Sequence, residues 1–217
     1  MKRIAVISCV NDRSKYDLMR SSLGATDVAE NYHVDFYPIY DAKSMSEGYN
    51  RGLNQAFPHT DYVLYVHQDI EFIGSEWLSL AIESIDYKQL DLVGVVGCDK
   101  LPESLVFWEG KCQGAVLEDR GGGKSLLNFG YKSSETQNSD MIDGLIMMTN
   151  KPLSWPDIPG FHFYDVLISQ KFIKNGFKVG VPHHSGMSLS HNIGTREFDS
   201  VTYLRARDHA REILRCL

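Results

Sequence analysis

The sequence predicts an α/β fold in which a largely parallel sheet is flanked by helices. The apolar run at residues 4–10 is rich in β-branched side chains, which is typical of a strand buried on both faces, and residues 34–40, with several aromatic side chains, predict a second strand. Segments with a helical period alternate with the later strands, and this alternation favours a doubly wound sheet. In such sheets ligands bind beyond the carboxyl ends of the strands.

The N-terminal half shows this alternation clearly. A Ser-Met-Ser-Glu capping box at residues 44–47 predicts the start of a helix, and apolar residues at every fourth position down to Phe57 give that helix one buried face. Pro58 ends it. The elements expected after it are a strand at residues 63–66, a helix at residues 75–85 and a strand at residues 92–97.

The pattern changes after residue 97. Residues 98–138 show no helical period and contain three consecutive glycines, which predicts an irregular insertion of short strands and a mobile loop. Beyond it we expect a strand at 143–149, a glycine-led loop at 160–165, a helix at 166–175, a strand at 178–181 and a final helix at 199–216. No repeat or linker divides the sequence, so a single domain over residues 1–217 is predicted.

The composition limits the classes of function. Hydrophobic residues make up 43% and charged residues 23%, which is ordinary for a soluble globular protein. The formal net charge of −6 opposes binding to a nucleic-acid backbone, so no nucleic-acid partner is expected. No apolar run approaches the about 20 residues of a membrane span, and the four cysteines lack disulfide or zinc spacing. We expect a cytoplasmic protein with free thiols and no integral membrane segment; a peripheral membrane contact stays open.

The strongest candidate for chemistry follows the third strand. Residues two apart in a strand point the same way, so His67 and Asp69 are expected to project together from the sheet edge. An imidazole and a carboxylate so placed can bind a divalent metal, and the carboxylate suits Mg²⁺ or Mn²⁺. The alternative is a polar strand end in which Asp69 caps the next segment.

These residues resemble the family 2 glycosyltransferases, which carry an Asp-x-Asp-type motif at the end of such a strand, after a helix with an Asn-x-Gly element. The chain has Asn50-Arg51-Gly52 in the helix and His67-Gln68-Asp69 after the strand. This pairing is similar to the branch linked to bacterial capsule and surface polysaccharide synthesis, in which His-Gln-Asp replaces Asp-x-Asp. The resemblance extends from Ile4 to about His191.

The resemblance implies a GT-A fold, which is a Rossmann-like mixed sheet flanked by helices. It also implies an inverting transfer of a hexosyl or N-acetylhexosaminyl group from a nucleotide-diphosphate donor, a UDP-sugar, to a glycan or a lipid-linked sugar. A divalent metal, Mn²⁺ or Mg²⁺, is the implied cofactor.

The resemblance gives roles to the residues near this edge. Asp69 is the carboxylate that meets the metal and the sugar diphosphate, and His67 takes the place of an Asp, which leaves the need for metal open. An acidic residue at the position of Asp41 contacts the base or ribose, although a simple turn aspartate is the alternative. Further residues expected on the donor side are Ser8, Cys9, Asn11, Asn50, Gln68 and Arg196.

The loop at residues 160–165 is the second element with a functional interpretation. The resemblance places the catalytic base at Asp165, which would take the proton of the acceptor hydroxyl, whereas the alternative is a helix N-cap. It places Asp143-Gly144 beneath the acceptor, where glycine admits a sugar close to the backbone; a plain turn is the alternative. His162 and Tyr164 are further candidate acceptor contacts, and the 98–138 segment is expected on the acceptor side.

A third cluster contains histidines, at residues 183, 184 and 191. The resemblance implies that one late histidine is a further metal ligand, with His184 the first choice and His191 the second. Two other classes of function stay open. One is a nucleotide-sugar-binding module without catalysis, which the His67 replacement favours. The other is a zinc hydrolase built from the histidine-rich segment, although no HExxH spacing is present.

Overall fold

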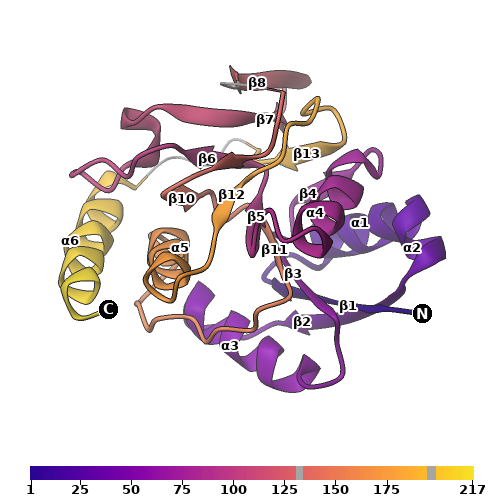
Figure 1. Cartoon of the computed structure of the whole chain (residues 1–217), viewed down its shortest axis with the longest axis horizontal. Coiled ribbons are helices and arrows are strands. Elements are labelled where there is room, and N and C mark those ends of the chain that lie inside the picture. Colours follow the sequence, from indigo (N-terminus) through magenta and orange to yellow (C-terminus); the bar gives the residue numbers. More distant parts are fainter. Residues whose placement is uncertain (131–133, 195–198) are drawn as a thin grey trace.

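The chain is built on a seven-stranded mixed sheet with helices on both faces (Figure 1). The computed structural model describes residues 1–130, 134–194 and 199–217. The strands of this sheet lie in the order β2-β1-β3-β11-β5-β12-β9. Their bounds are β1 Arg3–Cys9, β2 His33–Ile39, β3 Tyr62–Val66, β5 Leu92–Gly94, β9 Gln137–Asn138, β11 Ile146–Thr149 and β12 Val179–Val181.

The first three of these strands position the site. β1 pairs in parallel with both β2 and β3, so all three end at one edge of the sheet. β11 is antiparallel to both β3 and β5, which makes the sheet mixed. β1 and β3 are buried almost throughout, because helices cover both faces. The expected mixed sheet flanked by helices is therefore confirmed.

The helices divide between the two faces. One core holds buried side chains of α1 (Arg13–Gly24), α2 (Asp27–Asn31) and α4 (Glu76–Asp86). The other holds those of α3 (Met45–Ala56) and α5 (Tyr164–Lys174), against which α6 (Ser200–Cys216) packs. In the described residues no helix is both long and apolar enough to cross a membrane.

Helix α1 was not expected from the sequence. Its buried face consists of only Tyr16, Met19 and Leu23, and most of its other residues are polar, so its periodic signal is weak. Asp12 caps it by accepting hydrogen bonds from the backbone amides of Ser14 and Lys15. This cap fixes the start of α1 directly after β1, beside the sheet edge where ligands are expected.

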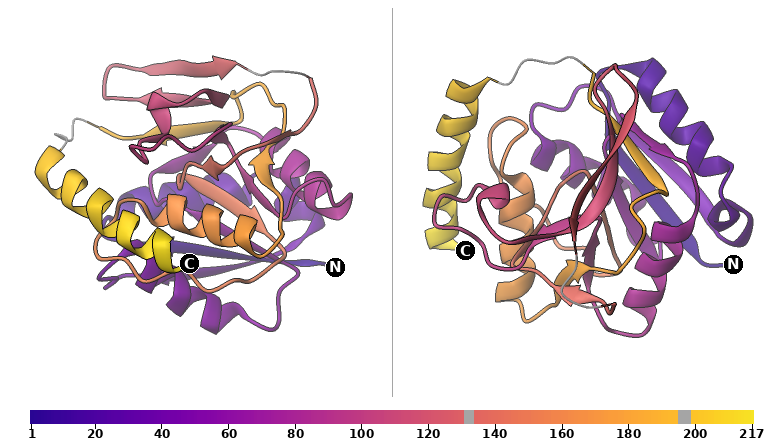
Figure 2. Two further views of the ribbon diagram at one scale, coloured as in Figure 1. Left: turned by 60° about the vertical axis from the view of Figure 1, so that its left-hand side comes forward. Right: turned by 90° about the horizontal axis from the view of Figure 1, so that it is seen from above.

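A second sheet lies above the end of the first (Figure 2). Its order is β10-β6-β7-β13-β4, with β8 paired to β7. The bounds are β4 Ile70–Phe72, β6 Val96–Cys98, β7 Cys112–Asp119, β8 Lys124–Gly130, β10 Met141–Ile142 and β13 Leu189–Asn192; a short 3-10 helix, η1, covers Phe107–Glu109.

Two expectations are corrected by this sheet. The single strand expected at residues 92–97 is wrong, because the chain turns at Val95 and its two halves, β5 and β6, join different sheets. The segment at residues 98–138 is more regular than expected, since β7 and β8 form an antiparallel hairpin within it. The exposed side chains of β8 carry no alternation of burial, which explains the weak strand signal.

The predicted N-caps of α3 and α6 are confirmed, and α5 begins earlier than the sequence predicted. Ser44 Oγ accepts from the Glu47 amide at 3.1 Å, and the Glu47 carboxylate accepts from the backbone just before the cap. Asp199 caps α6 through two backbone amides. Helix α5 begins at Tyr164, two residues earlier than expected, so Asp165 lies inside its first turn.

Candidate active site

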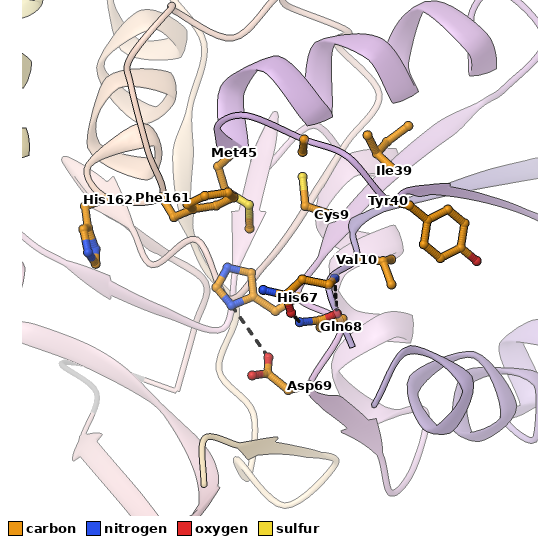
Figure 3. Close-up of a pocket in the computed structure, with 12 residues that line it drawn as sticks. Cys9, Val10, Ile39, Tyr40, Met45, His67, Gln68, Asp69, Phe161 and His162 are labelled. Atoms are coloured by element: carbon orange, nitrogen blue, oxygen red, sulfur yellow. Dashed lines mark hydrogen bonds and ion pairs between the residues drawn. The ribbon is translucent and has the colours of Figure 1, made fainter. Parts of the chain in front are cut away.

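A pocket of 440 Å³ lies at the carboxyl ends of β1, β2 and β3 (Figure 3). This is the sheet edge at which the sequence predicted a ligand site. The pocket is lined by residues that follow each of these strands, by the start of α3 and by the loop before α5: Cys9, Val10, Asn11, Ile39, Tyr40, Ala42, Met45, His67, Gln68, Asp69, Phe161 and His162.

Three side chains beside this pocket bring metal-binding atoms together. His67 Nδ1 lies 3.9 Å and His191 Nε2 lies 3.6 Å from the same oxygen of Asp69. The ligand atoms of all three residues lie within 4.8 Å of one another. Two imidazole nitrogens and one carboxylate oxygen suit a divalent transition metal such as Mn²⁺, with its remaining positions open to water or substrate oxygens. We call these residues the metal triad.

The surroundings keep the metal triad in a ligand-competent state. Burial alone would raise the pKa of the Asp69 carboxyl, but His191, His67 and Lys15 outweigh it and hold that pKa well below its usual range. Burial lowers the pKa of His67, opposed by the Asp69 charge. Asp69 is therefore ionised and burial favours a neutral His67, which are the protonation states that a metal requires.

The hydroxyl of Tyr164 sets the orientation of the His67 ring. Its Nε2 lies 2.6 Å from the Tyr164 hydroxyl, so its Nδ1 faces Asp69. A hydrogen bond to the second ring nitrogen is the usual means by which proteins orient a metal-binding histidine. Tyr164 therefore acts on the metal triad through His67, and the expectation that it contacts an acceptor stays a prediction.

Gln68 points toward the turn between β1 and α1. Its Oε1 accepts from the backbone amides of Asn11 and Asp12, both at 2.9 Å, and its Nε2 donates to Asn11 Oδ1. Ser8 Oγ donates to the Val66 carbonyl at 2.8 Å, joining β1 to β3. Cys9 lines the pocket, where burial raises the pKa of its thiol to about 12, so the thiol stays protonated.

A second, smaller pocket of 170 Å³ adjoins the first and holds Asp165. It shares His67, Phe161 and His162 with the larger pocket. Its other lining residues come mostly from η1, the start of α5 and α6: Leu105, Phe107, Trp108, Met141, Asp143, Phe163, Tyr164, Asp165, Val166 and Tyr203. After the roles that the sequence resemblance implies for the residues nearby, we call the larger space the donor-side pocket and the smaller one the acceptor-side pocket.

Asp165 is held in place by backbone amides. Its Oδ2 accepts from Gly144 at 3.2 Å and its Oδ1 from Val166 at 2.9 Å, so it is not the N-cap of α5. Burial, and then the charge of Asp143, raise the pKa of Asp165 to about 7. A carboxylate that titrates near neutral pH is suited to accept a proton during a reaction.

The Asp143-Gly144 pair forms a turn before β11, and the strand starts at Ile146 rather than at Asp143. Asp143 Oδ1 accepts from the Leu145 amide at 2.8 Å. A side chain on Gly144 would overlap the ring and hydroxyl of Tyr164. The close approach that requires glycine here is therefore to Tyr164, whereas the sequence suggested an approach by a sugar.

Several predicted site residues have other positions in the structure. Asp41 is exposed and forms an ion pair with Arg51 at 2.8 Å. Asn50 bonds to both the carbonyl and the amide of Trp155, which ties α3 to a distant segment. Arg196 lies outside the described residues.

The choice of His184 as a metal ligand is corrected by the structure. Its Nε2 donates to the Val95 carbonyl at 3.0 Å, and its Nδ1 accepts from the Gly186 amide at 3.1 Å. Both ring nitrogens are therefore used by the backbone. His191, the second choice, joins the metal triad instead. In the described residues the cluster that could hold a metal contains His191 but neither His183 nor His184, so these three histidines do not form the joint ligand set of a zinc hydrolase.

Three residues at the site were missed in the sequence. Lys15 lies 3.6 Å from Asp69, and Trp108 stacks on Tyr203 with ring centroids 5.8 Å apart and the planes at 28°. Lys15 lies on the unexpected helix α1, and Trp108 lies in the segment without a clear period. Tyr203 reaches this place through ring contacts of α6 with Trp108, His162 and Phe163, which no local sequence pattern signals.

This mixed sheet, with a pocket at the carboxyl ends of its parallel strands and with His67, Asp69 and His191 brought together beside it, has the GT-A glycosyltransferase fold. The model of the Glycosyltransferase like family matches residues 5–211, and the chain belongs to that family. No curated protein sequence matches the chain.

Two solved structures share the fold. The catalytic domain of Drosophila beta1,4galactosyltransferase 7, in complex with xylobiose, aligns with a TM-score of 0.60 and 12% identity, over 97% of this chain and 80% of that one. GalNAc-T7 with UDP, GalNAc and Mn²⁺ aligns with a TM-score of 0.60 and 11% identity, over 98% of this chain. The alignment spans only 48% of GalNAc-T7.

Proposed function

We propose that the chain is an inverting glycosyltransferase that moves a sugar from a UDP-sugar to a glycan or lipid-linked sugar. The observation that carries the proposal is the meeting of the two pockets at His67, with the metal triad beside one and Asp165 in the other. A transfer between two substrates needs adjoining sites of this kind, because the acceptor oxygen must reach the anomeric carbon of the donor.

The donor-side pocket supplies the groups that a nucleotide diphosphate needs. A divalent metal bound by His67, Asp69 and His191 would neutralise the charge on the leaving diphosphate. GalNAc-T7, which shares the fold, is a structure with UDP and Mn²⁺, and this supports UDP and Mn²⁺ as the first pair to test, with Mg²⁺ as the second metal. The ends of β1 and β2 line the rest of the pocket and would hold the nucleoside.

Asp165 is the proposed base on the acceptor side. It would accept the proton of the acceptor hydroxyl as that oxygen attacks the anomeric carbon from the face opposite the diphosphate, which gives inversion. Its raised pKa makes it a better proton acceptor than an ordinary carboxylate, and near neutral pH a substantial fraction is still ionised. Each oxygen accepts one backbone hydrogen bond, so the carboxylate keeps a lone pair for the substrate.

The aromatic side chains of the acceptor-side pocket suit a sugar. Trp108 is half exposed and stacks on Tyr203, and a sugar ring packs its apolar C–H face against such surfaces. The pocket volume of 170 Å³ is below the roughly 300–1,000 Å³ of drug-sized sites, which suits one sugar ring. Trp108 lies in the 98–138 segment, which supports an acceptor-side role for that segment within one catalytic domain.

The setting of the reaction follows from the family resemblance. His67-Gln68-Asp69 is similar to the motif of the capsule and surface polysaccharide branch, so we place the transfer in surface polysaccharide synthesis. A lipid-linked acceptor would be reached at the cytoplasmic face of the membrane through a peripheral contact. The transferred group would be a hexosyl or an N-acetylhexosaminyl unit.

Calorimetric titration of UDP, with and without Mn²⁺, tests the donor site. The native chain should bind UDP more tightly with Mn²⁺, and Asp69→Ala should lose that gain. Glu71→Gln is the matched control, because Glu71 lies two residues further on and pairs with Lys124 at 2.6 Å, away from the pocket. Failure of the folded native chain to bind UDP under both conditions would rule out a UDP donor.

The remaining alternative is a nucleotide-sugar-binding module without catalysis. It predicts metal-dependent binding of UDP without transfer to any acceptor. Release of UDP from a UDP-sugar in the presence of acceptor sugars separates the two proposals. Loss of that release in Asp165→Asn, with UDP binding kept, would support the transferase.

A further inference from the structure

Lys15 lies between the two segments that carry the metal triad. Its Nζ lies 3.6 Å from Asp69 Oδ2 and donates to the Asn192 carbonyl at 3.0 Å. Asn192 directly follows His191, and its amide donates to the Asp69 carbonyl at 2.8 Å. An ammonium group, about one-third exposed, thus lies against one oxygen of the carboxylate whose other oxygen faces His67 and His191.

We propose that Lys15 is a phosphate-binding residue of the donor site that holds Asp69 until metal and nucleotide arrive, so that the two ligands bind cooperatively. This inference rests on the proposed function and adds a residue and an order of events to it. It predicts that metal alone binds weakly, and that the diphosphate removes the obstacle by drawing Lys15 away from Asp69.

The charges at the site support this arrangement. The metal triad has one carboxylate where an Asp-x-Asp motif has two, and Lys15 cancels its charge. A divalent cation that enters alone is therefore placed beside an ammonium group in a partly buried site, where repulsion is only partly screened. A diphosphate brings at least two negative charges, which together with the Asp69 carboxylate balance the three positive charges of the metal and Lys15. By linkage, each ligand then raises the affinity for the other by the same factor.

The position of Lys15 also fits a group that moves between two partners. The residues that lead into helix α1 are bonded to the His67-Gln68-Asp69 motif, because the Gln68 side chain accepts from the amides of Asn11 and Asp12. The backbone of Lys15 is therefore fixed relative to Asp69. Its flexible side chain ends in a point charge with three donors, so it can exchange a carboxylate for a phosphate oxygen by rotation of its own bonds.

Calorimetry with three ligands tests the proposal: Mn²⁺ alone, UDP with Mn²⁺, and uridine. Lys15→Met should bind Mn²⁺ alone about threefold to tenfold more tightly and UDP with Mn²⁺ less tightly by a similar factor, with uridine binding unchanged. Lys15→Arg should restore much of the native UDP affinity. Arg13→Met is the matched control, because Arg13 lies in the same helical turn but is mostly exposed and faces Asp17.

The proposal is overturned if Lys15→Met, shown by thermal unfolding to be folded, binds Mn²⁺ no more tightly than the native chain. It is also overturned if UDP and uridine lose affinity equally. If the native chain binds Mn²⁺ but not UDP, the proposed donor is wrong and pyrophosphate replaces UDP in the same comparison. A loss of pyrophosphate affinity in Lys15→Met would then support the inference, and an unchanged affinity would refute it.

Discussion

The Tyr164 hydroxyl lies 2.6 Å from Nε2 of His67 and joins the acceptor-side pocket to the metal triad. Tyr164 directly precedes Asp165 in the first turn of α5, so one helical turn positions both the candidate base and the ring of His67, a candidate metal ligand. Gly144 permits this contact, because any side chain there would overlap the Tyr164 ring. The side chain of Tyr164 therefore lines the acceptor-side pocket and also contacts the metal triad.

Tyr164→Phe should weaken Mn²⁺ binding by about tenfold, the usual cost of removing an outer hydrogen bond from a metal-binding histidine. The fold should keep its stability, since the ring packing remains. Calorimetry with the metal alone measures the effect. Tyr49→Phe is the control, because the buried Tyr49 hydroxyl has no hydrogen-bond partner in the described part of the chain. Equal effects of the two substitutions would contradict the role given to Tyr164.

The parts of the site that depend on local sequence were predictable. Strand alternation predicted that His67 and Asp69 point the same way; their ligand atoms do lie 3.9 Å apart, but β3 ends at Val66 and both residues lie in the connection to β4. The apolar runs predicted β1 and β3, and the doubly wound pattern predicted a pocket at their carboxyl ends. The strand predictions succeed because each rests on the pattern of a single element, which the chain specifies over a few residues.

The third member of the metal triad, His191, and Lys15 were not predictable in this way. His191 reaches Asp69 because β13 pairs with β4 in a register that sets His191 opposite Ile70. That pairing joins residues about 120 positions apart, and no local pattern distinguishes His191 from His184. Lys15 depends on helix α1, whose three buried side chains gave too weak a period to recognise. Choices among similar residues therefore needed the tertiary structure.

The rate of transfer should rise with pH through about 7. Asp165 must be ionised to accept a proton, and burial together with Asp143 raises its pKa to about 7. Activity should therefore fall as the pH drops below that value. Asp165→Asn should lower the rate about 100-fold or more without changing UDP affinity. A flat rate profile from about 1.5 pH units below the expected midpoint to about 1 unit above it would argue against this base.

The same carboxyl group should make the fold less stable at high pH. Its pKa is raised in the folded state above the ordinary 3.8, so the folded chain holds the proton more tightly than the unfolded chain. Its contribution to stability is complete below pH 4 and is lost as the pH rises through about 7. As the pH is raised from 5 to 8, the free energy of unfolding of Asp165→Asn should therefore rise by roughly 1–3 kcal/mol relative to that of the native chain, measured by denaturant unfolding. If the free energies of unfolding of the two proteins changed in the same way with pH, the prediction would be wrong.

Trp108→Ala should raise the KM for the acceptor about tenfold and leave UDP binding unchanged, because stacking on a sugar contributes on the order of 1 kcal/mol. Trp108 lines the acceptor-side pocket and is absent from the lining of the donor-side pocket. Tyr87→Ala removes another exposed aromatic ring, at the end of α4, and serves as the control. A loss of UDP affinity in Trp108→Ala would indicate that Trp108 contacts the donor rather than the acceptor, which contradicts this prediction.

His191→Ala and His184→Ala should have opposite effects, because the structure gives one histidine to the metal triad and the other to the backbone. His191→Ala removes a ligand atom that lies 3.6 Å from Asp69, so Mn²⁺ affinity should fall by at least about tenfold with little change in stability. His184→Ala leaves the buried Val95 carbonyl without its donor, so unfolding should become easier by about 1–3 kcal/mol with Mn²⁺ affinity unchanged. Calorimetry and denaturant unfolding on the same two preparations separate the roles. If His184→Ala lowered Mn²⁺ affinity and His191→Ala did not, His184 would be the metal ligand. The pairing of β13 with β4 would then not explain the ligand set.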